Sequence, residues 1–425
     1  MKSYSFFTSK PTSKLTLPAF AIALICVSIH TAVAAESLVV SLHSIPDRIR
    51  KQNPDLAAAR YLIAEAQGRL TQSGRRDNPE LNIGVNHNGA FRERGVYIGL
   101  TQKFPVTNRL VLEKAVSATA LQGAQAEIRN IERQLIAESQ QILIKSLAIR
   151  RQKQLLKKQG DIATQLADYI GAAAEKGEGS ILDAGQARLE AAQFSNQLRQ
   201  LEAEAATLLG TLKPLLGMSV NEQLIISGSL PEIPTPSRSL NPARRPDLQA
   251  AKLGIQQASE AAVLERARRY DDIEVYFTGG YDRAEDVPEG YNEEAVFSFG
   301  VSIPLPLWNK NEGAIQEAEA RKVRREKEVM ALDKNIRHEA ATAHAEMAGW
   351  AKLAHEISTT LLPLAEKQAE LATQAYREGQ GDLQATLRTR EQLLKLASSR
   401  LNALRDFHLA KARYETALGF NQSSK

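Results

Sequence analysis

Side chains that could bind a metal ion are present in this sequence, but their spacing keeps them apart. The nearest neighbouring histidines, His338, His344 and His355, are separated by six and eleven residues. Two imidazoles on one helix share an ion when they are three or four residues apart. The sulfur ligands are one cysteine, Cys26, and, apart from the initiating Met1, three scattered methionines, Met218, Met330 and Met347. The pattern therefore predicts no metal site and no cofactor.

Catalytic motifs are also missing. The sequence contains no Gly-x-Ser-x-Gly elbow, no phosphate-binding loop and no His-Glu-x-x-His helix. Its paired acids, Asp271-Asp272 and Glu293-Glu294, lie beside strand-like stretches or in polar loops, where a solvated face explains them. We predict that the chain is not an enzyme; an envelope hydrolase is an alternative that no catalytic constellation favours.

The residues that do stand out are two glycine-rich turns in matching places. Lys176-Gly177-Glu178-Gly179 returns as Glu378-Gly379-Gln380-Gly381, and Leu216-Gly217 returns as Leu418-Gly419. Both landmarks are displaced by 202 positions, since 379 − 177 and 419 − 217 give the same value. The segment between the turn and the Leu-Gly end has one length in both halves, which indicates an internal duplication.

The duplication divides the chain into five parts. Residues 1–34 are expected to be a signal peptide, 35–217 a first repeat, 218–245 a proline-rich connector, 246–420 a second repeat and 421–425 a tail. Further landmarks recur, because Asn53-Pro54-Asp55-Leu56 returns as Arg245-Pro246-Asp247-Leu248 and Phe104-Pro105 as Ile303-Pro304. Proline followed by aspartate is typical of the first turn of a helix.

The N-terminal residues have the three parts of a secretory signal. An apolar run from Leu15 to Ile29 is followed by Ala32-Val33-Ala34. The basic residues before the run are Lys2, Lys10 and Lys14. Cleavage would remove Cys26 and these three lysines, so the formal charge would fall from +5 to 5 − 3 = +2. A charge this small gives no electrostatic case for binding nucleic acid.

Four stretches alternate between apolar and polar residues, which predicts strands. In the first half the apolar series are Leu81, Ile83, Val85 and Val96, Ile98, Leu100. In the second half they are Ile273, Val275, Phe277 and Phe297, Phe299, Val301, Ile303. Polar loops at 87–95 and 282–294 are expected to join each pair.

After the strands the apolar period lengthens to seven residues, which predicts coiled-coil helices. The seam residues are Leu121, Ile128, Leu135, Ile142, Ile149 and Leu156, then Phe194, Leu201, Leu208 and Leu215, and in the second half Leu387, Leu394 and Leu401. The first helix, expected from Val106 to Ala174, would be a rod about 100 Å long at about 1.5 Å per residue.

Strands of this length and alternation match membrane-spanning barrel strands. Four strands cannot close a barrel, and open edges in lipid would leave backbone groups unpaired. The strand count therefore predicts that copies of the chain associate. Aromatic residues near the strands are expected to form an interfacial belt: Phe91, Tyr97, Phe104, Tyr276, Tyr281, Tyr291 and Trp308. An amphipathic sheet in a soluble protein is the alternative.

The order of these parts, repeated twice, resembles the TolC-type outer-membrane efflux family. The resemblance implies a mixed α/β membrane protein, in which a homotrimer forms a twelve-stranded outer-membrane β-barrel continued by a periplasmic α-helical coiled-coil barrel. The segment from Ile303 to Gly313 is similar to a Pro-Leu-Pro-Leu-aromatic-Asn-basic-Asn-x-Gly stretch in channels of cobalt-zinc-cadmium efflux systems. Trp308 stands where phenylalanine is usual, and Lys310 where arginine is usual.

Two groups of functional residues follow. Pro105, Pro304 and Pro306 should end strands, because proline cannot donate a ladder hydrogen bond, and Asn309 or Asn311 could cap the helix beyond. The strand-to-helix turns thus comprise Pro105, Pro304, Pro306, Trp308, Asn309 and Gly313. The resemblance implies that the glycine-rich turns form a periplasmic tip where an adaptor docks and the entrance opens.

The predicted tip residues are Gly177, Gly179, Leu182, Asp183, Gly379, Gly381, Asp382 and Leu383. These glycines could instead serve only as helix C-caps, and Asp183 and Asp382 as N-caps. Arg377 or Glu378 could join ion pairs at the entrance.

The resemblance implies a passive outer-membrane channel. Its expected partners are a periplasmic adaptor (membrane fusion) protein, an inner-membrane pump of the resistance-nodulation-division type and outer-membrane lipid. Heavy-metal cations are the expected cargo; drugs or other small organic molecules, and a secreted polypeptide, are alternatives. A periplasmic coiled-coil scaffold without a pore is the alternative outside the channel class, supported by the heptads and opposed by the four strands.

Overall fold

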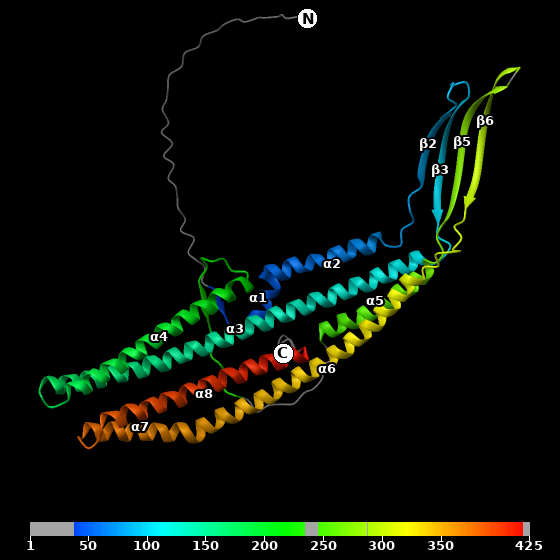
Figure 1. Cartoon of the computed structure of the whole chain (residues 1–425). Helices are drawn as coiled ribbons and strands as arrows, with labels where there is room; N and C mark the ends of the chain where they lie inside the picture. The colour runs from blue at the N-terminus through cyan, green and yellow to red at the C-terminus, as the bar shows by residue number, and fades with distance from the viewer. Residues whose placement is uncertain (1–37, 234–244, 287, 420–425) are drawn as a thin grey trace, which may run out of the picture. The chain divides into compact units, whose positions relative to one another are not determined.

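A computed structural model describes residues 38–233, 245–286 and 288–419 of the chain (Figure 1). The predicted signal peptide, the tail and much of the connector lie outside the described residues. The first repeat comprises β1 (Leu38–Val40), α1 (Ile45–Gln52), α2 (Pro54–Gln72), β2 (Glu80–His87), β3 (Arg94–Phe104), α3 (Arg109–Glu175) and α4 (Ile181–Leu215). After β4 (Leu224–Ile226), the second comprises α5 (Pro246–Ala267), β5 (Ile273–Asp286), β6 (Gly290–Ser302), α6 (Glu312–Glu356), the π-helix η2 (Ile357–Leu361), α7 (Leu362–Arg377) and α8 (Leu383–Leu418).

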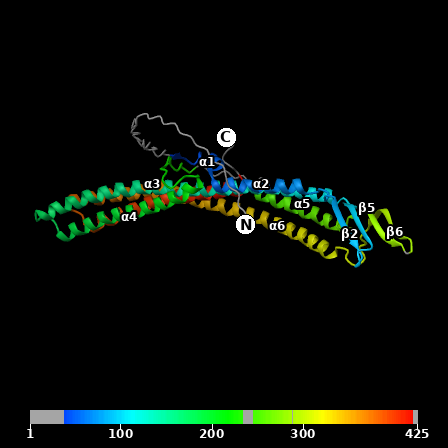
Figure 2. The same cartoon turned by 90° about the horizontal axis from the view of Figure 1, so that it is seen from above.

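The long helices predicted from the heptads are present. α3 has 67 residues, which corresponds to a rod of about 100 Å. It packs along α4 and also contacts α2, α5 and α8, whereas α6 packs along α8 (Figures 1 and 2). The seam residues Ile128, Ile149 and Leu156 are buried. No described helix is both long and apolar enough to cross a membrane.

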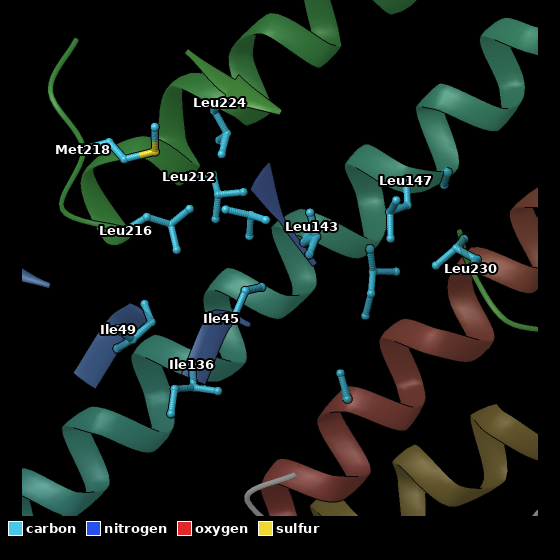
Figure 3. Close-up of a cluster of buried hydrophobic side chains, with 14 of the residues drawn as sticks. Ile45, Ile49, Ile136, Leu143, Leu147, Leu212, Leu216, Met218, Leu224 and Leu230 are labelled. Carbon is cyan, nitrogen blue, oxygen red and sulfur yellow. The ribbon is translucent and has the colours of Figure 1, made fainter. Parts of the chain in front are cut away.

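The largest hydrophobic cluster joins the middle of α3 to the short elements around it (Figure 3). Leu143 and Leu147 of α3 meet Leu212 at the end of α4, Ile45 of α1 and Leu224 of β4. β1 and β4 pair in parallel here, with Val39 opposite Ile225. No sequence pattern indicated this pair, because each strand has only three residues.

Each repeat closes on itself through one residue, which precedes α2 in the first repeat and α5 in the second. Asn53 caps α2 by accepting from the Leu56 N–H at 2.7 Å, and its amide donates to the Leu215 carbonyl at 2.7 Å. In the second repeat Arg245 occupies the same place and donates to the Ala417 carbonyl at 3.4 Å. Residues 215 and 417 are 202 positions apart, so the duplication predicted from the sequence is also a duplication of contacts.

The four predicted strands form one antiparallel sheet in the order β2-β3-β5-β6. β3 pairs with β5 across the two repeats, from Arg94 opposite Arg283 to Phe104 opposite Ile273. Within the described residues, β2 and β6 pair on one side only. The second loop is shorter than predicted, because β5 continues to Asp286 and β6 begins at Gly290, so the 282–294 segment is mostly strand.

The second repeat differs from the first by a π-helical turn, Ile357–Leu361, where α3 is continuous. Ser358 and Thr359 donate back to the Ala354 and His355 carbonyls at 2.7 and 2.9 Å. Arg400 of α8 donates to the Ser358 hydroxyl at 2.7 Å. Pro363 in the first turn of α7 has no N–H to donate, and its ring excludes the carbonyl four residues before it, which accounts for the break locally.

Candidate functional site

Both glycine-rich turns end their helices in the same Schellman arrangement. Gly177 has φ +78° and its N–H donates to the Ala174 carbonyl, while the Glu178 N–H reaches the Ala173 carbonyl at 2.9 Å. Gly379 has φ +69°, and the same two hydrogen bonds form there. Positive φ disfavours residues that carry a Cβ, so these two positions require glycine for the reversal of the chain.

The second glycine of each turn has a different role. Gly179 and Gly381 do not have positive φ, but each lies against the last turn of the helix before it. A Cβ on Gly381 would lie 2.8 Å from the Tyr376 nitrogen, and one on Gly179 would lie 3.3 Å from the Ala174 nitrogen. Close approach of the backbone therefore accounts for these glycines.

The returning helices begin with side-chain caps at equivalent positions, 180 and 382. The Ser180 hydroxyl accepts from the Asp183 N–H at 3.4 Å, and the Asp382 carboxylate accepts from Gln384 and Ala385 at 3.2 and 3.3 Å. The suggestion that Asp183 is an N-cap is therefore wrong, because it lies in the first turn of α4, while the same suggestion for Asp382 is correct. A carboxylate in either place stabilises the positive end of the helix.

Side-chain exposure separates the predicted tip residues. Leu182 is 71% exposed, whereas Leu383 is 2% exposed and packs among apolar residues of α3 and α4. Leu383 therefore cannot present its side chain at the surface, contrary to the prediction. Ile181, which the sequence analysis missed, is 82% exposed. Two adjacent apolar residues directly after a polar turn were the signal that could have identified it.

The cluster that buries Leu383 joins the two turns within one chain. It contains Leu166 and Ile170 of α3 and Ala184 of α4, with Tyr376 of α7 packed against it. Burial raises the pKa of Tyr376, and the negative charges of nearby groups, Asp183 and Asp382 among them, raise it further. The phenol therefore stays neutral and can donate a hydrogen bond at this junction.

Arg377 and Glu378 stand apart from that junction. Within the described part of the chain neither residue forms an ion pair, and both are exposed. Their proposed contribution to ion pairs at the entrance stays a prediction that would need a second copy of the chain. Arg390 of α8 and Glu190 of α4 interact electrostatically. Burial lowers the pKa of Arg390 and raises the pKa of Glu190.

The strand-to-helix turns follow the prediction for their prolines. β3 ends at Phe104, directly before Pro105, and β6 ends at Ser302, just before Pro304 and Pro306. Asn311 is the N-cap residue of α6 but makes no side-chain cap; its amide donates to the Glu265 carbonyl of α5 at 2.8 Å. The side-chain Oδ1 of Asn309 accepts from the Asn311 N–H at 3.0 Å, so Asn309 stabilises the turn and Asn311 connects it to α5.

The turn after β6 exposes apolar residues. Trp308 is 95% exposed, and Leu305 and Leu307 are exposed beside it. Gly313 lies in the first turn of α6, where a Cβ would meet open space, so neither crowding nor positive φ requires glycine there. An exposed tryptophan at a strand end is typical of a membrane interface.

An ion-pair cluster at the start of α3 was not predicted. Arg109, the first residue of α3, donates from Nε to Asp272 at 2.8 Å and also from Nη2 to the second oxygen of the same carboxylate. Glu113 accepts from Arg109 at 3.3 Å and from Arg268 at 3.2 Å. Because Arg109 and Asp272 are 163 residues apart, no local pattern indicates this pairing, which connects the start of α3 to the start of β5.

The sheet has two unlike faces. The register places Leu81, Leu100, Phe277 and Phe299 in one row across the four strands. All four are exposed within the single chain. The other face carries rows such as Asn82, Gly99, Thr278 and Ser298. All four strands thus expose an apolar face, and within the described residues β2 and β6 each have one edge without a partner strand. Exposing such a surface to water is unfavourable.

The sequence profile described as "Outer membrane efflux protein" matches two segments of the chain, residues 45–218 and 239–420. The two segments correspond to the two repeats. Over 300 residues, the chain is 23% identical to the cobalt-zinc-cadmium resistance protein CzcC of Cupriavidus metallidurans, covering 70% of each protein.

Solved structures show the same fold. CusC aligns with a TM-score of 0.73 at 17% identity, covering 89% of this chain and 92% of that one. VceC of Vibrio cholerae, an outer membrane protein, aligns with a TM-score of 0.71 at 17% identity, covering 89% and 96%. The outer-membrane channel OprN gives a TM-score of 0.71 at 16% identity, covering 89% and 90%. With both repeats matched by the family profile, the chain belongs to the outer membrane efflux protein family, whose members are channels and not enzymes.

Proposed function

We propose that this protein is the outer-membrane channel of a tripartite efflux system and passively conducts heavy-metal cations out of the cell. Three copies would join their sheets into a twelve-stranded barrel in the outer membrane, and their helices would continue the duct in the periplasm. Membership of the family supports the channel class. The trimeric assembly and the heavy-metal cargo go beyond family membership and are our proposal.

The observation that carries the proposal is the four-stranded sheet with its exposed apolar face. In a soluble protein such a face would be covered, yet Ile83, Ile98 and Phe297 are exposed on it. Lipid covers an apolar face, and strands from further copies pair the free edges of β2 and β6. This arrangement also argues against a periplasmic coiled-coil scaffold, which would have no use for the sheet.

The helical turns are the proposed docking site for the periplasmic adaptor. Gly177, Gly179, Gly379 and Gly381 hold the reversals, and Leu182, Asp183 and Asp382 lie beside them, with Ile181 in place of Leu383. Ile181 and Leu182 offer an apolar contact at an otherwise polar end. The adaptor would connect the channel to an inner-membrane pump of the resistance-nodulation-division type.

Heavy-metal cargo is supported by two observations. The relative CzcC is named a cobalt-zinc-cadmium resistance protein. The segment from Ile303 to Gly313 is similar to the turn common in channels of such systems. Efflux of drugs or other small organic molecules is the second candidate, since the structural relatives include channels whose descriptions mention no metal.

The test is growth of a strain lacking this gene on zinc, cobalt, cadmium, nickel, copper and silver salts, beside a panel of dyes and antibiotics. We expect sensitivity confined to metal salts and restored by the intact gene. A complementing gene with Ile181→Asp and Leu182→Asp should fail to restore growth while its product still reaches the outer membrane. Sensitivity to organic compounds alone would contradict the metal assignment.

A further inference from the structure

Two tyrosines on the polar face of the sheet lie opposite glycines in the strand pairing. In the first hairpin Tyr97 of β3 is paired with Gly84 of β2. In the second hairpin Tyr276 of β5 is paired with Gly300 of β6. Both repeats therefore place one large ring beside a residue without a side chain.

The rings occupy the space above those glycines. A Cβ added to Gly84 would overlap the hydroxyl end of the Tyr97 ring, and one added to Gly300 would overlap the same end of Tyr276. On its other side, Tyr97 pairs with Gly280. Each tyrosine ring thus lies over the neighbouring strand, close to the sheet. It can do so because the residue beneath it is a glycine, which has no side chain.

The polar face carries small residues around these rings. The row between the two tyrosines consists of Asn82, Gly99, Thr278 and Ser298. If the apolar face meets lipid, the polar face lines the lumen. On that arrangement Tyr97 and Tyr276 would belong to the wall of the duct and not to the predicted aromatic belt, because they lie on the face opposite to Leu100 and Phe277.

We propose that Gly84 and Gly300 set the width of the duct within the membrane by letting Tyr97 and Tyr276 lie flat against its wall. The inference rests on the proposed channel function. In a trimer each pair would occur three times around the bore. A side chain at either glycine would force the ring into another rotamer, in which it projects into the lumen and narrows the path.

The opposite face offers a matched control. Gly279 of β5 is paired with Phe297 of β6, and a Cβ there would lie 3.1 Å from the Phe297 ring. The glycine and the ring are again partners across two strands, with a looser contact than at Gly84 and Gly300, and they lie on the apolar face. Gly279→Val should therefore disturb Phe297 without changing the bore.

The experiment is single-channel current across a planar lipid bilayer, measured on the purified oligomer of each variant. We expect Gly84→Val and Gly300→Val to lower the conductance relative to the unmodified protein, and Gly279→Val to leave it unchanged. Adding Tyr97→Ala to Gly84→Val should restore the conductance at least to its original value, because the displaced ring is then absent. Where a valine variant does not assemble, Gly84→Ala replaces it, since its single methyl group already overlaps the ring.

Normal conductance in assembled Gly84 and Gly300 variants would overturn the inference, as would a loss in Gly279→Val equal to theirs. If Tyr97→Ala did not restore the conductance of Gly84→Val, the displaced tyrosine ring would not be the obstruction, and the inference would be wrong. Absence of current through the unmodified oligomer would instead contradict the proposed channel function, so the two failures are distinguishable.

Discussion

Gly177 and Gly379 are the residues on which the reversal of each helical hairpin depends. Both have positive φ, and both repeats use them in the same pair of backbone hydrogen bonds. Alanine in this conformation costs about 1–2 kcal/mol. The turns are therefore determined by backbone conformation, whether or not a partner binds them.

Gly177→Ala should loosen the first turn. We expect the amide of Glu178, which is protected by the Ala173 carbonyl, to exchange its hydrogen about tenfold faster, in keeping with a loss of about 1.4 kcal/mol. Gly185→Ala is the control, because Gly185 lies inside α4 with open space around it, and alanine there should stabilise the helix by about 0.5–1 kcal/mol. If the Glu178 amide exchanged at the same rate in Gly177→Ala and Gly185→Ala, positive φ at Gly177 would not be what stabilises the turn.

A buried ion cluster joins the two repeats at the start of α5. Arg245 donates to Asp247 at 2.7 and 3.0 Å and to Glu339 at 2.8 Å, and Arg133 lies 3.8 Å from Asp247. Burial alone would raise the pKa of Asp247, but the hydrogen bonds and charge of Arg245, with the charge of Arg133, outweigh it and hold this pKa below its ordinary value of 3.8.

The depressed pKa of Asp247 predicts how stability depends on pH. Because the folded pKa lies below that of the unfolded chain, the ionised carboxylate stabilises the fold fully above pH 3.8, and this is lost as pH falls through the lower value. Asp247→Asn should lower the free energy of unfolding by about 1–3 kcal/mol at neutral pH, and the difference from the unmodified protein should shrink in acid. Thermal unfolding at a series of pH values measures it.

Asp55→Asn is the matched control, because Asp55 holds the equivalent place in α2 but is exposed. Its effect should be about 0.5 kcal/mol or less at any pH. If both substitutions cost the same, the cluster around Arg245 does not stabilise the fold.

At the scale of elements, the sequence predicted most where the pattern is periodic. Alternation at Leu81, Ile83 and Val85 identified a strand whose bounds the structure places at Glu80–His87, and heptads identified α3. Pro105 and Pro304 marked strand ends for a local reason, since proline lacks an N–H.

The contacts that were missed depend on parts of the chain far apart in sequence. Leu383 is buried because the two hairpins pack together, and Asn311 turns to Glu265 because α5 lies beside it. Arg109 and Asp272 meet through the pairing of β3 with β5. Periodicity in one element carries no information on such partners.

Asn53→Ala tests how α2 is joined to the end of α4. The substitution removes the acceptor of the Leu56 N–H at the start of α2 and the donor to the Leu215 carbonyl, both at a buried position. We therefore expect the free energy of unfolding to fall by about 2–3 kcal/mol. Ser180→Ala removes an exposed and longer cap and should cost about 0.5–1 kcal/mol. Chemical unfolding at one protein concentration compares them, and a smaller loss for Asn53→Ala than for Ser180→Ala would contradict this account.

At the scale of the whole molecule, the proposed assembly depends on the free edges of β2 and β6. Glu80, at the start of β2, lies in the same row as Gly300 of β6 within one chain, and closing a barrel would stagger this register between copies. β2 and β6 lie at opposite edges of the sheet, so cysteines placed on them are too far apart to form a disulfide within one chain. A link between them is therefore evidence that two copies of the chain have met.

Cysteine cross-linking tests this pairing. Glu80→Cys, combined in turn with a single cysteine at each position of β6 from Tyr291 to Ser302, should give bands of two and three chains after oxidation in at least one combination, and none larger in any, because the strands of a closed barrel are staggered between copies and the third link closes the ring. Glu80→Cys with Thr278→Cys is the control, since Thr278 lies on an inner strand and should give no link. Bands continuing beyond three chains would indicate open association instead of a closed barrel.

The most direct test of the channel assignment is the current carried by the unmodified, purified oligomer in a planar lipid bilayer. A barrel formed by β2, β3, β5 and β6 from three chains should insert in discrete events, each adding one step of equal ohmic conductance. A folded oligomer that binds the bilayer and never carries current would contradict the assignment.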